Sequence, residues 1–315
     1  MIISASYKTD IPTFYGEWFI RRLRAGFCKM VNPYGRQVHR VALDRSAVDG
    51  FVFWTKNVAP FLKHLPEVRE RGFPFTVQYT INGSPRALET AVVDAERSVE
   101  TAWKVREVYG PRALVWRYDT IVMSSITPAD FHVENFRRLA SRLEGATDEV
   151  VVSFAQIYKK TRRNLDIAAA DAGFTWADPT ADEKRRLLTS LVRIARERRM
   201  QLSVCSQRDL LVDGSSDARC VDAQRLTGMA GSSIRARLKG NRKDCGCFES
   251  RDIGEYDTCP HGCVYCYAAQ SRELALSRFR KHSPDSEFLF EPAFGAPVEP
   301  PSEPTGRALK LFDGS

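Results

Sequence analysis

Short apolar runs rich in β-branched and aromatic residues alternate along this chain with longer stretches of helical periodicity. Runs of this kind predict buried strands, and the stretches between them predict amphipathic helices. One predicted helix covers residues 86–109, and another follows a capping sequence that begins at Thr180. The predicted strands are residues 2–6, 50–55, 75–80, 113–118, 149–155 and 201–206.

Strands that are separated by helices require right-handed crossovers and a parallel sheet. The six units therefore predict an α/β fold, a partial or complete (βα) barrel, whose body is residues 1–206. Beyond it the pattern changes to a segment rich in Gly, Arg and Cys, which we expect to complete the barrel over 207–292 and to include a helix over 267–282. The proline-rich stretch 293–315 predicts a disordered tail.

The composition of the 315 residues, 43% hydrophobic, is that of a globular protein. No window approaches the ~18 apolar residues of a membrane span, and the N-terminus lacks the layout of a signal peptide. We therefore expect a cytoplasmic protein with no membrane partner. The net charge of +8 is compatible with a nucleic-acid partner without requiring one. The most basic stretch free of acid is RARLKGNRK, residues 235–243.

Cysteines carry the most specific signal, because seven of the eight lie between Cys205 and Cys266. In a cytoplasmic chain such a concentration indicates metal or redox chemistry rather than disulfides. Cys259, Cys263 and Cys266 form a C-x3-C-x2-C motif with Tyr265 before the last cysteine. Three thiolates on one tight loop can bind three irons of a 4Fe–4S cube and leave the fourth iron open. Zinc modules, by contrast, usually close all four positions of the ion.

This motif resembles the signature of the radical S-adenosylmethionine superfamily. The phrases SASYKTDIPTFY, FVFWTKN, VWRYD and DIGEYDTCPHGCVYCYA are similar to a bacterial domain of unknown function, family 1848, over roughly residues 1–290, and more distantly to the spore photoproduct lyase and DNA-repair lyase group. The resemblance implies a 4Fe–4S cluster that cleaves S-adenosylmethionine to a 5′-deoxyadenosyl radical. It also implies an external electron donor of the flavodoxin or ferredoxin type. The substrate stays open, with nucleic acid among the candidates.

The position of the motif departs from the pattern of that superfamily, in which the three-cysteine loop follows the first barrel strand. Here it follows CFESRDIG, residues 247–254, near the C-terminus. We therefore expect a circular permutation in which 247–254 supplies the first strand and residues 2–6 the next. We also expect the loop to close onto the mouth of the barrel. A GGE-like segment, the usual site for the amine of S-adenosylmethionine, is not identifiable.

Polar residues follow the predicted strands, where the chemistry of α/β barrels is found. We assign a catalytic role to Lys56, Arg117 and Asp119. The residues assigned to cofactor binding are Asp10, Asn57, Ser153 and Tyr265. The alternative for any one of them is that strand ends are polar because they reach solvent.

With the motif and the distant Cys28 set aside, four of the eight cysteines are left, which is the number that closes a metal site completely: Cys205, Cys220, Cys245 and Cys247. They predict a second metal site, either another 4Fe–4S cluster or zinc, and spacing does not decide between the two. Buried apolar cysteines without metal are the third alternative. The competing function is a zinc- or cluster-stabilised nucleic-acid-binding protein without radical chemistry, in which RARLKGNRK contacts phosphate.

Overall fold

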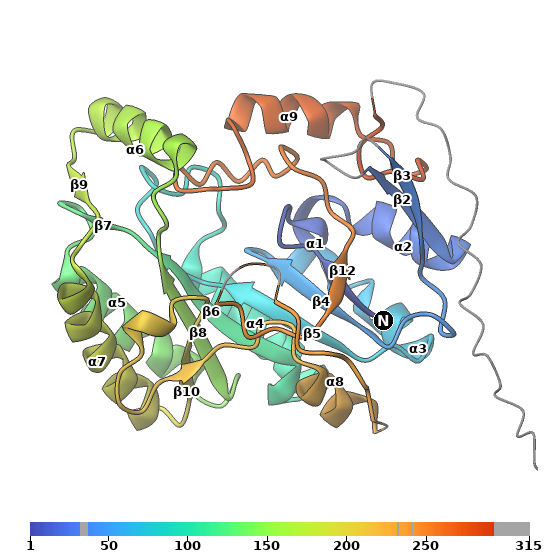
Figure 1. Ribbon diagram of the computed structural model, residues 1–315, viewed down its shortest axis with the longest axis horizontal. Helices are drawn as coiled ribbons and strands as arrows, with labels where there is room; N and C mark the ends of the chain where they lie inside the picture. The colour runs from blue at the N-terminus through green and yellow to red at the C-terminus, as the bar shows by residue number, and fades with distance from the viewer. Residues whose placement is uncertain (32–36, 232, 241, 243, 293–315) are drawn as a thin grey trace, which may run out of the picture.

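The computed structural model describes residues 1–31, 37–231, 233–240, 242 and 244–292. The expected tail over 293–315 and two positions of RARLKGNRK, 241 and 243, lie outside the described residues. Eight strands form one sheet in the order β11-β10-β8-β6-β5-β4-β1-β12 (Figure 1). These strands are β1 (Ile2–Ala5), β4 (Gly50–Thr55), β5 (Phe75–Thr80), β6 (Leu114–Ile121), β8 (Glu149–Phe154), β10 (Gln201–Val204), β11 (Ser216–Asp217) and β12 (Ser250–Asp252).

Two small antiparallel ladders and nine α-helices complete the described part of the chain. The ladders pair β2 (Phe27–Val31) with β3 (Val38–Ala42), and β7 (Met123–Ser124) with β9 (Trp176–Ala177). The helices are α1 (Ile11–Phe14), α2 (Gly16–Ala25), α3 (Leu65–Glu70), α4 (Ala95–Tyr109), α5 (Ala129–Leu143), α6 (Lys159–Ala172), α7 (Ala181–Glu197), α8 (Ala223–Ala230) and α9 (Arg272–Lys281). None of these helices is both long and apolar enough to span a bilayer.

The prediction of a parallel α/β sheet is confirmed. All six predicted strands are present, and every ladder between neighbours in the large sheet is parallel. Among the described residues, no ladder joins β11 to β12, so the sheet is an open, partial barrel rather than a closed one. The segment after residue 207 contributes a strand to each edge of this sheet.

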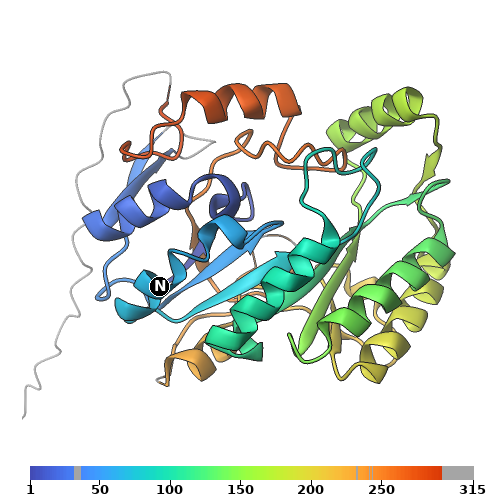
Figure 2. The same ribbon diagram turned by 180° about the vertical axis from the view of Figure 1, so that it is seen from behind.

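Both faces of the sheet are buried, which explains why its strands read as continuous apolar runs. In β4, Phe51 and Phe53 pack into the main core with side chains of α2, α3, α4, α5 and α7. These helices cover that face (Figure 2). The intervening residue Val52 faces the opposite side, where Cys220 and Leu226 cover the sheet. The cysteine-bearing segment is therefore part of the packing of the second face.

The parallel pairing of β12 with β1 brings together two segments that are about 250 residues apart in the sequence. Ile2 lies opposite Ser250, and Ser4 lies opposite Asp252. The buried carboxylate of Asp252 accepts hydrogen bonds from the Ser4 hydroxyl at 2.8 Å and from backbone N–H groups at 2.9 Å. The expected neighbourhood of segment 247–254 and residues 2–6 is confirmed.

The helix expected over 86–109 is shorter, because residues 86–94 form a loop and α4 begins after Asp94, whose carboxylate accepts from the backbone N–H of Glu96. Contacts of that loop with the three-cysteine loop outweigh its helical periodicity. The helix expected over 267–282 likewise begins only at Arg272, where Ser271 caps it. The capping box at Thr180 is confirmed, with Glu183 as its reciprocal partner.

His132 on α5 gives the fold a titratable group that must stay neutral. Its ring nitrogens contact the Tyr118 hydroxyl at 2.9 Å and the Val122 carbonyl oxygen at 3.1 Å. Burial lowers the pKa of His132 to about 4. In the unfolded chain the His132 imidazole binds a proton with a pKa near 6.5. As the pH falls below that value, protonation of His132 therefore favours the unfolded state.

We expect the stability that His132 confers to be complete above pH 6.5 and to be lost as the pH falls toward 4. Between pH 7 and pH 4.5 the wild type should lose about 2 to 3 kcal/mol more than a His132→Gln variant. Urea unfolding of both proteins at a series of pH values measures this difference. Parallel pH profiles for the two proteins would contradict the assignment.

Candidate functional site

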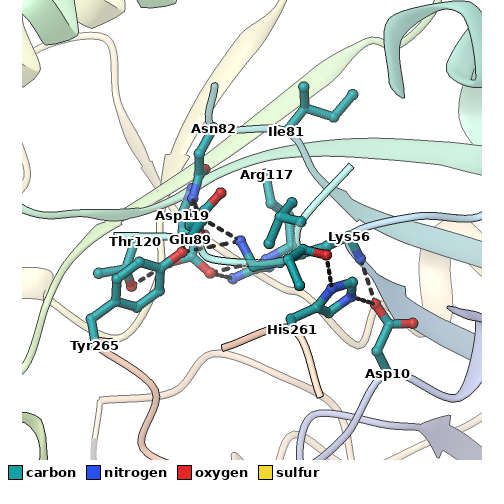
Figure 3. A network of polar contacts seen from close by, with 12 residues as sticks. Asp10, Lys56, Ile81, Asn82, Glu89, Arg117, Asp119, Thr120, His261 and Tyr265 are labelled. Carbon is teal, nitrogen blue, oxygen red and sulfur yellow. Dashed lines mark hydrogen bonds and ion pairs between the residues drawn. The ribbon is translucent and has the colours of Figure 1, made fainter. Parts of the chain in front are cut away.

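The three-cysteine loop, residues 254–271, begins directly after β12 and therefore lies at the carboxyl edge of the parallel sheet. The Tyr15 hydroxyl donates to the carbonyl oxygen of Thr258 at 2.5 Å. Within the motif, His261 Nε2 contacts Asp10 Oδ2 at 2.8 Å, and both side chains are buried. Asp10 in turn accepts from the backbone N–H of Lys56 at 2.7 Å (Figure 3). One carboxylate thus fixes the loop to the ends of two strands.

A second attachment comes from the loop that precedes α4. Backbone N–H groups of Thr90 and Ala91 donate to the carbonyl oxygens of Gly262 and His261 at 3.4 and 2.8 Å. Gly262 has a φ of 72°, and a Cβ there would lie 2.5 Å from Arg272 Cδ, so this turn requires glycine. The pairing places Glu89 against the three-cysteine loop.

Buried Glu89 and the partly buried Lys56 and Tyr265 form a polar network at the centre of this edge (Figure 3). Lys56 Nζ lies 2.8 Å from Glu89 Oε1 and donates to the Tyr265 hydroxyl at 3.1 Å. The Tyr265 hydroxyl donates to the same carboxylate. Asn82 supplies a further donor to Glu89 at 2.9 Å. The aromatic residue of the cysteine motif is therefore bound directly to the end of β4.

The charges of this pair are stabilised by each other. Burial alone would raise the pKa of Glu89, but the Lys56 charge and the hydrogen bonds that Glu89 accepts lower it below its usual value. Burial likewise opposes the charge on Lys56, and the nearby Glu89 carboxylate holds the pKa of the ammonium above its usual value. Both groups stay charged at neutral pH.

A second ion pair lies beside the first, on β6. Arg117 Nη2 lies 2.6 Å from Asp119 Oδ2, and the Ser153 hydroxyl donates to the other oxygen of that carboxylate. Burial opposes the charge of Asp119, but Arg117 and Ser153 lower its pKa below the usual value. The backbone N–H of Asp119 donates to Asn82 Oδ1 at 2.9 Å. Asn82 therefore links the two ion pairs (Figure 3).

The two other residues expected to bind a cofactor, Asp10 and Asn57, make structural contacts. Asp10 caps α1 through the backbone N–H of Thr13 and holds Lys56 and His261. The side-chain oxygen of Asn57 accepts from the backbone N–H of Ala59 at 3.1 Å within its own loop. The geometry thus gives both side chains structural contacts at the edge of the site.

The motif cysteines Cys259, Cys263 and Cys266 are free and half-buried, beside the Lys56–Glu89 pair. Burial raises the pKa of Cys263 to about 12, and the Lys56 charge opposes this shift. Burial also raises the pKa of Cys259, with the other two thiols adding to the effect. Cys259 and Cys263 therefore lie in a poorly solvated loop, where a bound cation would favour their thiolate forms.

The four remaining cysteines gather on the other side of Arg117, whose Nη1 lies 2.9 Å from Cys220 Sγ. As placed, the described residues contain no three or more His, Cys, Asp or Glu side chains that converge as ligands of a single ion. A 4Fe–4S cube does not require such convergence at the motif, because each thiolate binds a different iron.

Glu89, Asn82 and His261 are members of the site that sequence reasoning missed. Glu89 lay within a stretch read as helix, where a glutamate is expected to face solvent. Asn82 follows β5 directly, so the rule that singled out the other strand ends also applies to it. His261 stands inside the cysteine motif, which was the available signal for it.

Removing one member of the buried Lys56–Glu89 pair should leave an unpaired charge in a poorly solvated site. We expect Lys56→Met to destabilise the protein by about 3 kcal/mol, and Lys56→Met with Glu89→Leu to restore most of that loss. Urea unfolding measures both. The exposed pair of Lys63 and Glu17 is the matched control, where Lys63→Met should cost less than about 1 kcal/mol. Equal losses at the two pairs would contradict the buried arrangement.

Comparisons with known proteins identify the family but supply no activity. No curated protein matches the chain. A proposed alpha-L-fucosidase from Bacteroides thetaiotaomicron is a similar solved structure, at 12% identity and a TM-score of 0.25, over 76% of this chain and 83% of that one. This likeness is too weak to carry an argument about fold or function. The model of a domain of unknown function, DUF1848, matches residues 2–268, and the chain therefore belongs to this family.

Proposed function

We propose that this protein is a radical S-adenosylmethionine enzyme whose chemistry takes place at the carboxyl edge of the parallel sheet. Cys259, Cys263 and Cys266 hold a 4Fe–4S cluster with one open iron. When bound, that cluster would supply the electron that cleaves S-adenosylmethionine to methionine and a 5′-deoxyadenosyl radical. The electron comes from an external donor of the flavodoxin or ferredoxin type.

The docking of the cysteine loop is the observation that carries this proposal. Tyr265, between two motif cysteines, hydrogen bonds with Lys56 and Glu89 at the end of a central strand. A primary radical does not survive diffusion through solvent, so the group that generates it must adjoin the substrate site. The available ligand atoms also fit the cluster, because three cysteine sulfurs that form no disulfide share one poorly solvated loop. The open iron needs no fourth thiolate.

The spatial order of the elements supports the proposal as well. β12, the three-cysteine loop and α9 follow one another, and β1 is the next strand of the sheet. In the superfamily that the motif resembles, the loop follows the first strand and precedes the first helix. The DUF1848 chain has that arrangement in space if its order is circularly permuted, with residues 250–281 taken first.

The polar groups at the edge have distinct roles in this proposal. Lys56 and Glu89 fix the loop against the sheet and keep a charged pair beside the thiols. Arg117 and Asp119 form the second pair, and their position on β6 suits them to bind a polar substrate. Ser153 orients the Asp119 carboxylate. Held by so many partners, these side chains need little reorganisation when a ligand binds.

Replacement of one motif cysteine should abolish the chemistry. We expect Cys263→Ala to lose its iron after anaerobic reconstitution and to release no 5′-deoxyadenosine when reduced with S-adenosylmethionine. Cys28→Ala is the matched control, because Cys28 is buried beside β3, outside the motif. That variant should keep about four irons per chain at the motif and should form 5′-deoxyadenosine at the parental rate. A Cys263→Ala protein that forms 5′-deoxyadenosine at the parental rate would refute the assignment.

Nucleic-acid binding is the second candidate function, and a basic groove favours it. A hollow of about 790 Å³ runs along the edge strand β12, lined by more basic than acidic side chains. Its exposed members Arg235, Arg237 and Lys239 come from RARLKGNRK. Lys8, at the end of β1, continues the groove toward the carboxyl edge. A polyanion in this groove would pass close to the three-cysteine loop.

If the groove binds phosphates, its affinity should depend on salt. We expect Arg235→Ala with Arg237→Ala to weaken binding of a single-stranded oligonucleotide and to reduce the slope of log K against log salt by about 1.4. Fluorescence anisotropy at several salt concentrations measures the slope. Arg137→Ala with Arg193→Ala removes the same charge from the exposed surfaces of α5 and α7 and should leave the slope unchanged. Equal slopes in both double variants would exclude the groove.

A further inference from the structure

Four cysteines outside the motif meet in one cluster although three separate segments supply them. Cys205 directly follows β10, Cys220 lies between β11 and α8, and Cys245 and Cys247 precede β12. The sulfur atoms of Cys220 and Cys205 lie 3.6 Å apart. Cys205, Cys220 and Cys247 belong to one buried cluster of side chains, and the Cys245 side chain packs against it. None of the four forms a disulfide, and all but the half-buried Cys245 are buried.

We propose that these four cysteines bind one zinc ion that joins the two edges of the open sheet. β11 and β10 form one edge of the sheet, and β12 forms the other. As placed, the four side chains share one cluster without converging on a single point, and rotations about their Cα–Cβ bonds would bring the sulfurs around the ion. The site is separate from the motif cysteines, so it does not rest on the proposed radical chemistry.

The separation of the sulfurs favours a single ion over a cube. Zinc binds thiolates at ~2.3 Å, so two of its tetrahedral ligands lie roughly 3.8 Å apart. The 3.6 Å between Cys205 and Cys220 is close to that value. In a 4Fe–4S cube each thiolate binds a different iron, and the ligand sulfurs lie farther from one another. Four thiolates also leave no open position, which is the pattern of a structural zinc site.

The surroundings of the cluster suit the charge of a tetrathiolate zinc site, which is −2. Arg117 Nη1 lies 2.9 Å from Cys220 Sγ, and Arg242 Nη2 lies 3.7 Å from Cys205 Sγ. The backbone N–H of Val221 donates to Cys247 Sγ at 3.3 Å. Two guanidinium groups and an amide are the partners that a buried anionic metal site requires. Arg117 is thereby shared between this site and Asp119.

Close backbone approaches at two glycines let the segments meet. A Cβ on Gly246, between the paired cysteines, would lie 2.8 Å from Asp217 Oδ2 and 3.1 Å from the Ala218 carbonyl oxygen. A Cβ on Gly240 would lie 2.3 Å from the carbonyl oxygen of Cys245. The backbone N–H of Phe248 also donates to the Val221 carbonyl oxygen at 3.0 Å. The segment before β12 is therefore fixed against the segment after β11.

Metal analysis of a full-length chain without the motif thiols tests the proposal. In the triple variant Cys259→Ala, Cys263→Ala, Cys266→Ala we expect about one zinc per chain. Adding Cys220→Ser should lower the zinc content at least about fivefold, whereas adding Cys28→Ser should leave it unchanged. Absence of zinc from the triple variant, or zinc that survives Cys220→Ser, would overturn the proposal. About four irons in the triple variant after anaerobic reconstitution, in place of zinc, would overturn it too.

Cobalt substitution keeps the test decisive if Cys220→Ser fails to fold. Cobalt(II) in a tetrahedral thiolate site has intense visible bands that depend on the number of sulfur ligands. We expect these bands in the triple variant, and weaker, shifted bands when Cys245→Ser, at the half-buried position, is added. Bands that do not change on this substitution would exclude Cys245 as a ligand and refute the four-cysteine site. If the wild type binds no iron at the motif, only the proposed radical chemistry is contradicted, because the zinc site does not involve the motif cysteines.

Discussion

The parallel pairing of β12 with β1 is the constraint on which the rest of the site depends. Because the two strands run in the same direction, the segment that leaves β12 emerges at the edge where β4, β5 and β6 also end. Asp252 fixes this exit by binding hydroxyl and backbone donors from residues 4–7 and from Gly254. An antiparallel pairing would have sent the cysteine motif to the opposite edge, away from every charged residue of the site.

The edge is held together by buried charges rather than by apolar contacts alone. Taking two ion pairs out of water is costly, and the cost is offset only where each charge finds several partners. Asn82 meets this condition for both pairs at once, since its amide donates to Glu89 and accepts from the backbone of Asp119. The backbone carbonyl oxygen of Asn82 in turn accepts a hydrogen bond from the Asn135 side chain on α5, at 2.6 Å. The site is thus supported from the helical layer of the fold.

The strands were predictable from the sequence because both faces of a parallel sheet are buried, so each strand is an uninterrupted apolar run. The helical reading of residues 86–94 failed because periodicity reports only local preference, and here the backbone of Thr90 and Ala91 pairs with a segment some 170 residues away. Glu89 was missed for the same reason. Asp10 was predicted, but its contact with His261 joins residues 251 positions apart, and the local sequence around Asp10 does not reveal that pairing.

The order in which the chain is made gives the β1–β12 pairing a further consequence. Strands β1, β4, β5, β6, β8 and β10 can associate while synthesis continues, but the outer side of β1 stays without its partner until residues 250–252 leave the ribosome. Contacts between residues so far apart in sequence form late. An unpaired strand edge is also a site of aberrant association. A chain shortened before residue 250 would therefore lack β12 and would leave the edge of β1 free to pair with a strand of another molecule.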